Sequence, residues 1–231
     1  MPRRAFVLLA LLSATPACAQ FSGSATVLSD YRYRGVSLSD GRPAVQLGAT
    51  HDWPGGAYAG ILASSVHFAG DGAHVLLLPY LGYAHRVRPG LNWEIGAQYS
   101  HFIGACDGCY PELYAGLGSD HLSARVYYAR NYFGQAPALY AELNATRSLS
   151  ARLRAISHAG ALRSGGGDEG DNAGDRYRYD LRLGVALTTR ACEMQLTWGT
   201  TRSGGGVYPR YPFAGDAARN DAWVLAFSRQ W

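Results

Sequence analysis

The sequence has no apolar run long enough to cross a membrane as a helix, because such a span needs about eighteen or more residues. The apolar run Ala5–Leu12 is much shorter, and two arginines precede it. The triplet ACA, Ala17–Ala19, follows this run and has the small-x-small form of a cleavage site. We therefore predict that residues 1–19 form a cleaved signal peptide. Acylation of Cys18, as in a lipoprotein, is a weaker alternative because the residues before it fit a lipobox poorly.

The sequence also lacks a strong charge excess of either sign. It has 21 basic and 17 acidic residues, and removing Arg3 and Arg4 with the signal leaves 19 basic residues, a net charge of +2. Nucleic-acid-binding proteins usually carry a clustered basic excess. We therefore expect no nucleic-acid partner, although Tyr31–Arg34 alternates aromatic and basic side chains as some nucleic-acid surfaces do.

Cysteine is scarce, with four residues in all. Cys18 leaves with the predicted signal, and Cys106 and Cys109 form the motif CDGC. In the oxidising compartment that export implies, this spacing predicts a disulfide between Cys106 and Cys109. One histidine, His101, and two cysteines do not supply the four ligands of a zinc site, so we expect no metal and no cofactor. Cys192 is expected to be a buried or lipid-facing thiol without chemistry.

Catalytic motifs are missing as well. The sequence contains neither G-x-S-x-G nor H-E-x-x-H. Ser100–His101 and Ser157–His158 are sequence neighbours, and neighbouring side chains on a strand point to opposite faces, so neither pair forms a catalytic dyad. An enzyme, such as an outer-membrane hydrolase, is therefore disfavoured but not excluded.

What the sequence has in abundance is a two-residue period of apolar and polar side chains. In Arg176–Leu187, tyrosine, leucine and valine occupy one face, while arginine and aspartate share the other face with small residues. Twelve segments of this kind follow one another: 22–34, 43–52, 57–69, 75–87, 92–103, 112–119, 121–131, 138–147, 151–163, 176–188, 192–202 and 221–231. The orientation of 57–69 and 75–87 stays open, because both of their faces are apolar. This period indicates β-strands.

The connections between these segments alternate in length, and every second connection is short. Outer-membrane barrels show this pattern, with short periplasmic turns and longer outer loops. The 16 tyrosines and five tryptophans of the chain fit interfacial aromatic girdles. A soluble β-sandwich is the main alternative, but its strands are shorter on average. We therefore predict an all-β fold for residues 20–231, a transmembrane antiparallel up-and-down β-barrel of about twelve strands.

The first of these segments also carries a family motif. It comprises Ser29–Arg32, Arg34–Gly35, Ser37, Ser39–Asp40 and Pro43–Ala44, and Tyr140–Thr146 matches a later family segment. In these residues the chain resembles the TorF family of porins, also catalogued as Gcw_chp, a family of uncharacterised proteobacterial outer-membrane proteins. The likeness is strong only in the first fifty residues or so, and the CDGC and acidic loops are not part of it. It implies an outer-membrane barrel with channel activity and no known substrate.

If the apolar faces contact lipid, the opposite faces line the lumen. The predicted lumen residues are Asp30, Arg32, Arg34, Glu94, Arg125, Glu142, Arg152, Arg154, Arg176, Arg178, Asp180, Arg182 and Glu193. A ring of charge inside a pore selects ions. One hypothesis is therefore a positive wall with weak anion preference, formed by Arg152, Arg154, Arg176, Arg178 and Arg182. The alternative is that these arginines pair with acids and only stabilise the lumen.

Two further clusters admit two interpretations each. Asp30, Arg32, Arg34 and Asp40 form either a gate at the first hairpin or a structural salt-bridge set that fixes the strand register and the Gly35 turn. The acids of the glycine-rich loop either bind a divalent cation or belong to a solvated surface loop, and the second is favoured because their spacing misses the EF-hand pattern. These loop residues are Asp168, Glu169, Asp171 and Asp175.

The sequence as a whole favours a passive channel in the outer membrane of a Gram-negative bacterium. Its expected partners are membrane lipid, small solutes or ions, and the barrel-assembly machinery, which would contact the last strand ending at Trp231. A structural or adhesive barrel without an open pore is the alternative. The oligomeric state stays open.

Overall fold

The computed structural model describes residues 20–68, 72–165, 176–204 and 221–231. Its strands are β1 (Gln20–Leu28), β2 (Arg32–Tyr33), β3 (Val36–Ser37), β4 (Ala44–Asp52), β5 (Ala57–Ser65), β6 (Val75–Arg88), β7 (Leu91–Ile103), β8 (Tyr110–Gly118), β9 (Leu122–Tyr132), β10 (Ala136–Ser148), β11 (Leu153–Ser164), β12 (Arg176–Thr188), β13 (Glu193–Gly204) and β14 (Asp221–Gln230). Within these residues, no helix is long and apolar enough to cross a membrane. The predicted signal peptide and the acids of the glycine-rich loop lie outside the described residues.

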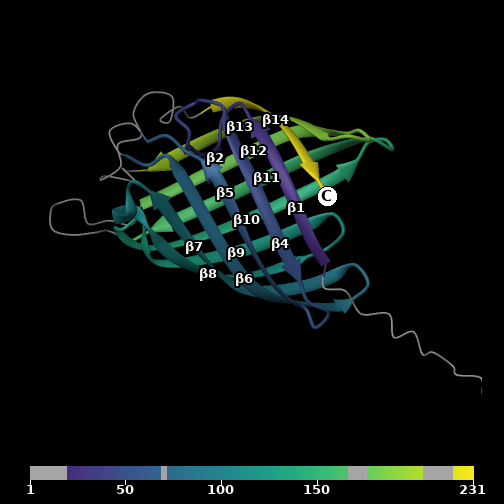
Figure 1. The fold of residues 1–231 in the computed structure, drawn as a ribbon, viewed down its shortest axis with the longest axis horizontal. Coiled ribbons are helices and arrows are strands. Elements are labelled where there is room, and N and C mark those ends of the chain that lie inside the picture. The colour runs from purple at the N-terminus through teal and green to yellow at the C-terminus, as the bar shows by residue number, and fades with distance from the viewer. Residues whose placement is uncertain (1–19, 69–71, 166–175, 205–220) are drawn as a thin grey trace, which may run out of the picture.

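Twelve of the described strands form one closed antiparallel barrel, as predicted (Figure 1). Each barrel strand pairs with the next one along the chain, and β1 pairs with both β4 and β14, which closes the ring. The short strands β2 and β3 stand apart as a two-stranded hairpin. Closure leaves no open sheet edge in the wall, and a lipid environment requires this because it offers backbone groups no other partner.

The two-residue period separates an apolar outer surface from the lumen. On β12, Tyr179 is 56% exposed, whereas Arg178 and Asp180 are 8% and 7% exposed inside the barrel. The structure also settles the orientation of the two segments that are apolar on both faces. Ile61 of β5 and Leu81 of β6 are exposed on the outside of the barrel. An outer surface of this kind suits lipid contact.

The connections alternate in length, as predicted. Short turns join consecutive strands at one end of the barrel, at residues 53–56, 89–90, 119–121, 149–152 and 189–192. At the other end, the connection 133–135 is an exception to the expected greater length. Two predicted strand ends are wrong, because β1 ends at Leu28 instead of residue 34 and β5 ends at Ser65 instead of residue 69.

Tyrosine rings inside the barrel lie over glycines of neighbouring strands. Tyr58 of β5 pairs with Gly82 of β6, and Gly96 of β7 pairs with Tyr114 of β8. A Cβ atom on Gly82 would come within 2.5 Å of the Tyr58 ring, and Gly96 meets Tyr114 in the same way. Glycine at these positions therefore lets bulky rings lie close to the wall, which leaves room in the middle of the barrel for a folded segment.

Candidate functional site

The connection between β1 and β4, residues 29–43, folds into the barrel and carries β2 and β3. We call these residues the lumen hairpin. Tyr31 is buried, and Tyr33 packs against the buried cluster inside the barrel. The alternation of the predicted strand 22–34 places both tyrosines on the face opposite Arg32 and Arg34, against lipid, and this expectation is wrong. The chain turns inward after Leu28, so the two-residue period of the hairpin no longer separates lipid from lumen.

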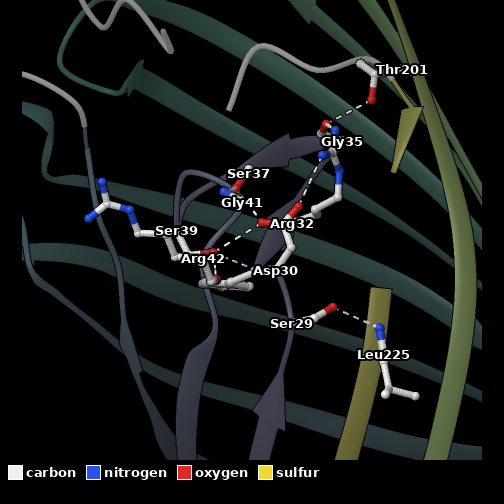
Figure 2. Close-up of polar contacts among 11 residues, drawn as sticks. Ser29, Asp30, Arg32, Gly35, Ser37, Ser39, Gly41, Arg42, Thr201 and Leu225 are labelled. Atoms are coloured by element: carbon white, nitrogen blue, oxygen red, sulfur yellow. Dashed lines mark hydrogen bonds and ion pairs between the residues drawn. The ribbon is translucent and has the colours of Figure 1, made fainter. Parts of the chain in front are cut away.

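The base of the lumen hairpin is fixed by its own polar side chains (Figure 2). The Asp30 carboxylate accepts hydrogen bonds from the hydroxyls of Ser37 and Ser39 and pairs with Arg32 Nη1 at 3.2 Å. Ser39 Oγ also accepts a hydrogen bond from the Tyr31 amide at 2.9 Å. These contacts support the interpretation of Asp30 and Arg32 as a structural set that shapes the turn.

The tip of the hairpin contacts the barrel wall. The Gly35 carbonyl accepts hydrogen bonds from Arg32 Nη2 at 2.7 Å and from the Thr201 hydroxyl of β13 at 2.8 Å (Figure 2). Gly35 has a φ of 80°, and a Cβ atom there would lie 2.8 Å from the Asp180 Cβ atom. Arg34 has a φ of 49°. This left-handed conformation costs a non-glycine residue about 1–3 kcal/mol, so contacts of the Arg34 side chain must offset it.

Arg34 pairs with Glu112 on the far side of the lumen. Its two terminal nitrogens donate to the two carboxylate oxygens at 2.8 and 3.0 Å, and the two side chains are 4% and 1% exposed. Glu112 also accepts hydrogen bonds from Gln98 at 2.7 Å and from the Tyr33 hydroxyl at 3.2 Å. Burial raises the pKa of the Tyr33 phenol well above its ordinary value, with Glu112 adding to the rise and Arg34 opposing it, so Tyr33 remains a donor. Breaking such a buried pair costs about 3–5 kcal/mol.

Four tyrosine rings surround the Arg34 guanidinium. Its carbon atom lies 4.7 Å from the ring centre of Tyr33, 4.8 Å from Tyr127, 5.4 Å from Tyr132 and 4.4 Å from Tyr140. Each ring face attracts a cation by about 0.5–2 kcal/mol. Tyr127 and Tyr132 belong to β9, which lies opposite β1 in the ring of strands, so the lumen hairpin crosses the lumen.

A cavity of about 590 Å³ adjoins the lumen hairpin. Its lining includes arginines and acids in nearly equal numbers: Arg32, Arg34, Arg125 and Arg182 against Glu94, Glu142 and Asp180. A tyrosine-rich wall and small polar residues complete it. This polar space inside an apolar-faced barrel is the candidate functional site.

Most of the predicted lumen charges have partners inside the barrel. Arg125 Nε lies 2.5 Å from Glu94 Oε1, and His158 Nε2 lies 2.8 Å from Asp180 Oδ1. Glu142 accepts hydrogen bonds from the Tyr127 hydroxyl and from an asparagine amide, with no cation among these partners. The charges therefore stabilise the lumen wall more than they form a ring of free charge.

The structure does not assemble the proposed positive wall of five arginines. Arg152 lies in the turn before β11, and Arg154 pairs with Glu193. The Arg176 side chain lies outside the described residues, and Arg178 is buried and donates to Ser203. Arg182 alone of the five lines the cavity, where it has no ion-pair partner among the described residues.

Glu112, the partner of Arg34, is absent from the predicted lumen residues. Glu112 lies on the lumen face of β8, where its alternation with Leu113 marks it as an inward side chain. Arg34 is 78 positions away in the chain. The alternation could have identified Glu112 as a lumen residue, but nothing in the sequence connects it with Arg34.

The cysteines lie near the two ends of the barrel. Cys106 and Cys109 are joined by a disulfide, and His101 Nδ1 lies 3.5 Å from each sulfur. Among the described residues these three form the one group with metal-ligand spacing, but the disulfide holds both sulfurs. Cys192 is free and half-buried, and it lies in a short turn. The prediction of a buried or lipid-facing thiol is therefore wrong.

The family is decided by a match over nearly the whole chain. A model described as "Bacterial protein of unknown function (Gcw_chp)" matches residues 13–229. The chain belongs to the Gcw_chp family. The family resemblance of the first segment is thereby confirmed under this name, although not under the name TorF. No curated protein matches this Gcw_chp chain.

Solved structures of porins share the fold of this Gcw_chp chain. The NanC porin is similar with a TM-score of 0.56 and 9% identity, over 90% of this chain and 98% of that chain. The KdgM porin in complex with disordered oligogalacturonate is similar with a TM-score of 0.51 and 8% identity, over the same shares of the two chains. At these identities the likeness establishes the barrel fold alone.

Proposed function

We propose that the chain is an outer-membrane channel of porin type, through which small solutes or ions diffuse passively. The observation that carries this proposal is the polar lumen cavity of about 590 Å³ within a closed barrel whose outer face is apolar. Such a barrel satisfies its backbone in lipid and offers water a path through its interior. The proposal also includes export of the chain by a signal peptide at residues 1–19 and its assignment to the TorF porins.

The lumen hairpin forms the constriction of the proposed channel. It crosses from β1 to the opposite wall and lines the cavity with Arg32, Arg34 and Gly35. Arg32 and Arg34 are each paired with an acid, so they add little net charge. Arg182 has no such partner among the described residues, and we assign to it a preference for anions, which is weak because Glu142 lines the same cavity with no cation among its partners.

Planar-bilayer recordings of the purified protein test this proposal. We expect stepwise conductance and, under a salt gradient, a reversal potential that indicates a weak preference for anions. In Arg182→Gln this preference should fall or reverse, because a cation with no ion-pair partner in the described part of the chain is gone while Glu142 stays. Arg88→Gln, on an exposed strand end, is the matched control and should leave the reversal potential unchanged. A reversal potential that is identical in all three proteins contradicts the role of Arg182.

A structural barrel without an open pore is the second candidate function. One observation favours it: Tyr31, Val36 and Leu38 of the lumen hairpin join a buried apolar cluster with Phe102 and Phe133. A cluster of this kind fills part of the barrel interior. Bilayers that stay silent with folded, heat-modifiable protein would support this candidate over the channel.

A further inference from the structure

The pocket around Arg34 is built mainly by the barrel wall. Glu112 comes from β8, Tyr127 and Tyr132 from β9, and Tyr140 from β10. The hairpin supplies only Arg34 and one ring. Four of the groups that contact the guanidinium are therefore fixed on adjacent strands, whatever the position of the hairpin.

These groups have the chemistry of a receptor for an organic cation. The Glu112 carboxylate presents two oxygens to two parallel N–H donors, at 2.8 and 3.0 Å, which is the geometry that a planar guanidinium fits. The rings of Tyr127 and Tyr140 lie 4.8 and 4.4 Å from the cation centre, and tyrosine faces attract positive charge. The Glu112 side chain is 1% exposed, so without a cation it would be a buried and uncompensated charge.

The backbone conformation of Arg34 indicates that contacts in the pocket stabilise its side chain there. Arg34 adopts a φ of 49°, which is strained for any residue other than glycine. We infer that Glu112, Tyr127, Tyr132 and Tyr140 form a binding site for guanidinium-type organic cations, which Arg34 occupies as a tethered internal ligand. Small alkylammonium ions, which lack the planar fork, should bind the same site more weakly.

The site is reached from the lumen. Arg34, Tyr127 and Tyr140 all line the cavity of about 590 Å³, so a small solute in that cavity meets the edge of the pocket directly. In the wild type, a free cation must displace Arg34, whose tether gives it a high effective concentration. A free guanidinium compound should therefore bind the wild type weakly and a variant without the Arg34 side chain more tightly.

Calorimetric titration of the Arg34→Ala barrel in detergent with methylguanidinium chloride tests the inference without requiring a conducting channel. We expect saturable binding, at least about tenfold tighter than in the wild type, because no tethered group competes. Methylurea, a neutral molecule of nearly the same shape, should not bind. Arg88→Ala is the matched control, because Arg88 does not line the cavity, and this variant should behave as the wild type does.

The carboxylate is tested by the double variant Arg34→Ala/Glu112→Gln, which should lose the binding. A folded Arg34→Ala barrel that binds no methylguanidinium overturns the inference, and so does equal binding of methylurea or of the double variant. If Arg34→Ala does not fold, Arg34→Lys keeps a charge in the pocket, and methylguanidinium should still bind it more tightly than the wild type. A silent bilayer would count against the proposed channel but not against this site.

Discussion

At the scale of single residues, burial decides which charges matter. The Arg34–Glu112 pair has side chains that are 4% and 1% exposed, whereas those of Arg154 and Glu193 are 40% and 21% exposed. Water screens the second pair, so its contribution is below about 1 kcal/mol. Water has little access to the first pair, so we expect this pair to determine whether the lumen hairpin keeps its position.

We expect Glu112→Gln to destabilise the folded position of the lumen hairpin inside the barrel by about 3–5 kcal/mol. The substitution leaves the Arg34 charge buried without a counter-charge. The open fraction in single-channel recordings should rise. Glu193→Gln, in the screened pair, is the matched control and should change the open fraction little. Equal effects of the two substitutions would show that the Arg34–Glu112 pair has no special role in holding the hairpin.

At the scale of elements, the lumen hairpin departs from the rest of the chain. Every other described strand belongs to the barrel wall, whereas β2 and β3 pair only with each other. The hairpin holds its shape through Asp30 and its position through Glu112 and Thr201. Its removal should therefore leave the wall intact, because no wall strand depends on it for its ladder.

Replacing residues 31–41 with a short glycine–serine linker should raise the single-channel conductance several-fold, because the segment that crosses the lumen is gone. The barrel should keep its heat-modifiable mobility on gels, which checks that it still folds. A conductance equal to that of the wild type would place the constriction elsewhere in the barrel.

At the scale of the whole molecule, the two ends of the barrel differ, and a native residue reports which end faces the cell interior. Cys192 is the one free cysteine among the described residues and lies in a short turn. Outer-membrane barrels place their short turns in the periplasm. Maleimide coupled to a polymer too large for the lumen should therefore leave Cys192 unlabelled in intact cells and label it once the outer membrane is permeabilised. Labelling of intact cells would reverse the proposed orientation.

The barrel could be predicted from the sequence because its wall strands separate apolar from polar side chains at every second residue, as Tyr179 and Asp180 do. The lumen hairpin could not be predicted, because the same alternation continues through Tyr31–Arg34 after the chain has left the wall. What turns the chain inward is the bonding of Asp30 to serines several positions later. Such contacts between side chains leave no period in a sequence.

The seam between β1 and β14 has a consequence for the timing of assembly. Residues Ser24–Leu28 pair with Ala226–Gln230, and the backbone of Trp231 exchanges two hydrogen bonds with Gly23. Strand β1 therefore has no β14 partner until β14 has been synthesised, so a shorter chain cannot close the ring. Contacts between residues so distant in sequence make folding slow. Closure of the barrel is therefore a single late step, which comes after all twelve wall strands have been synthesised.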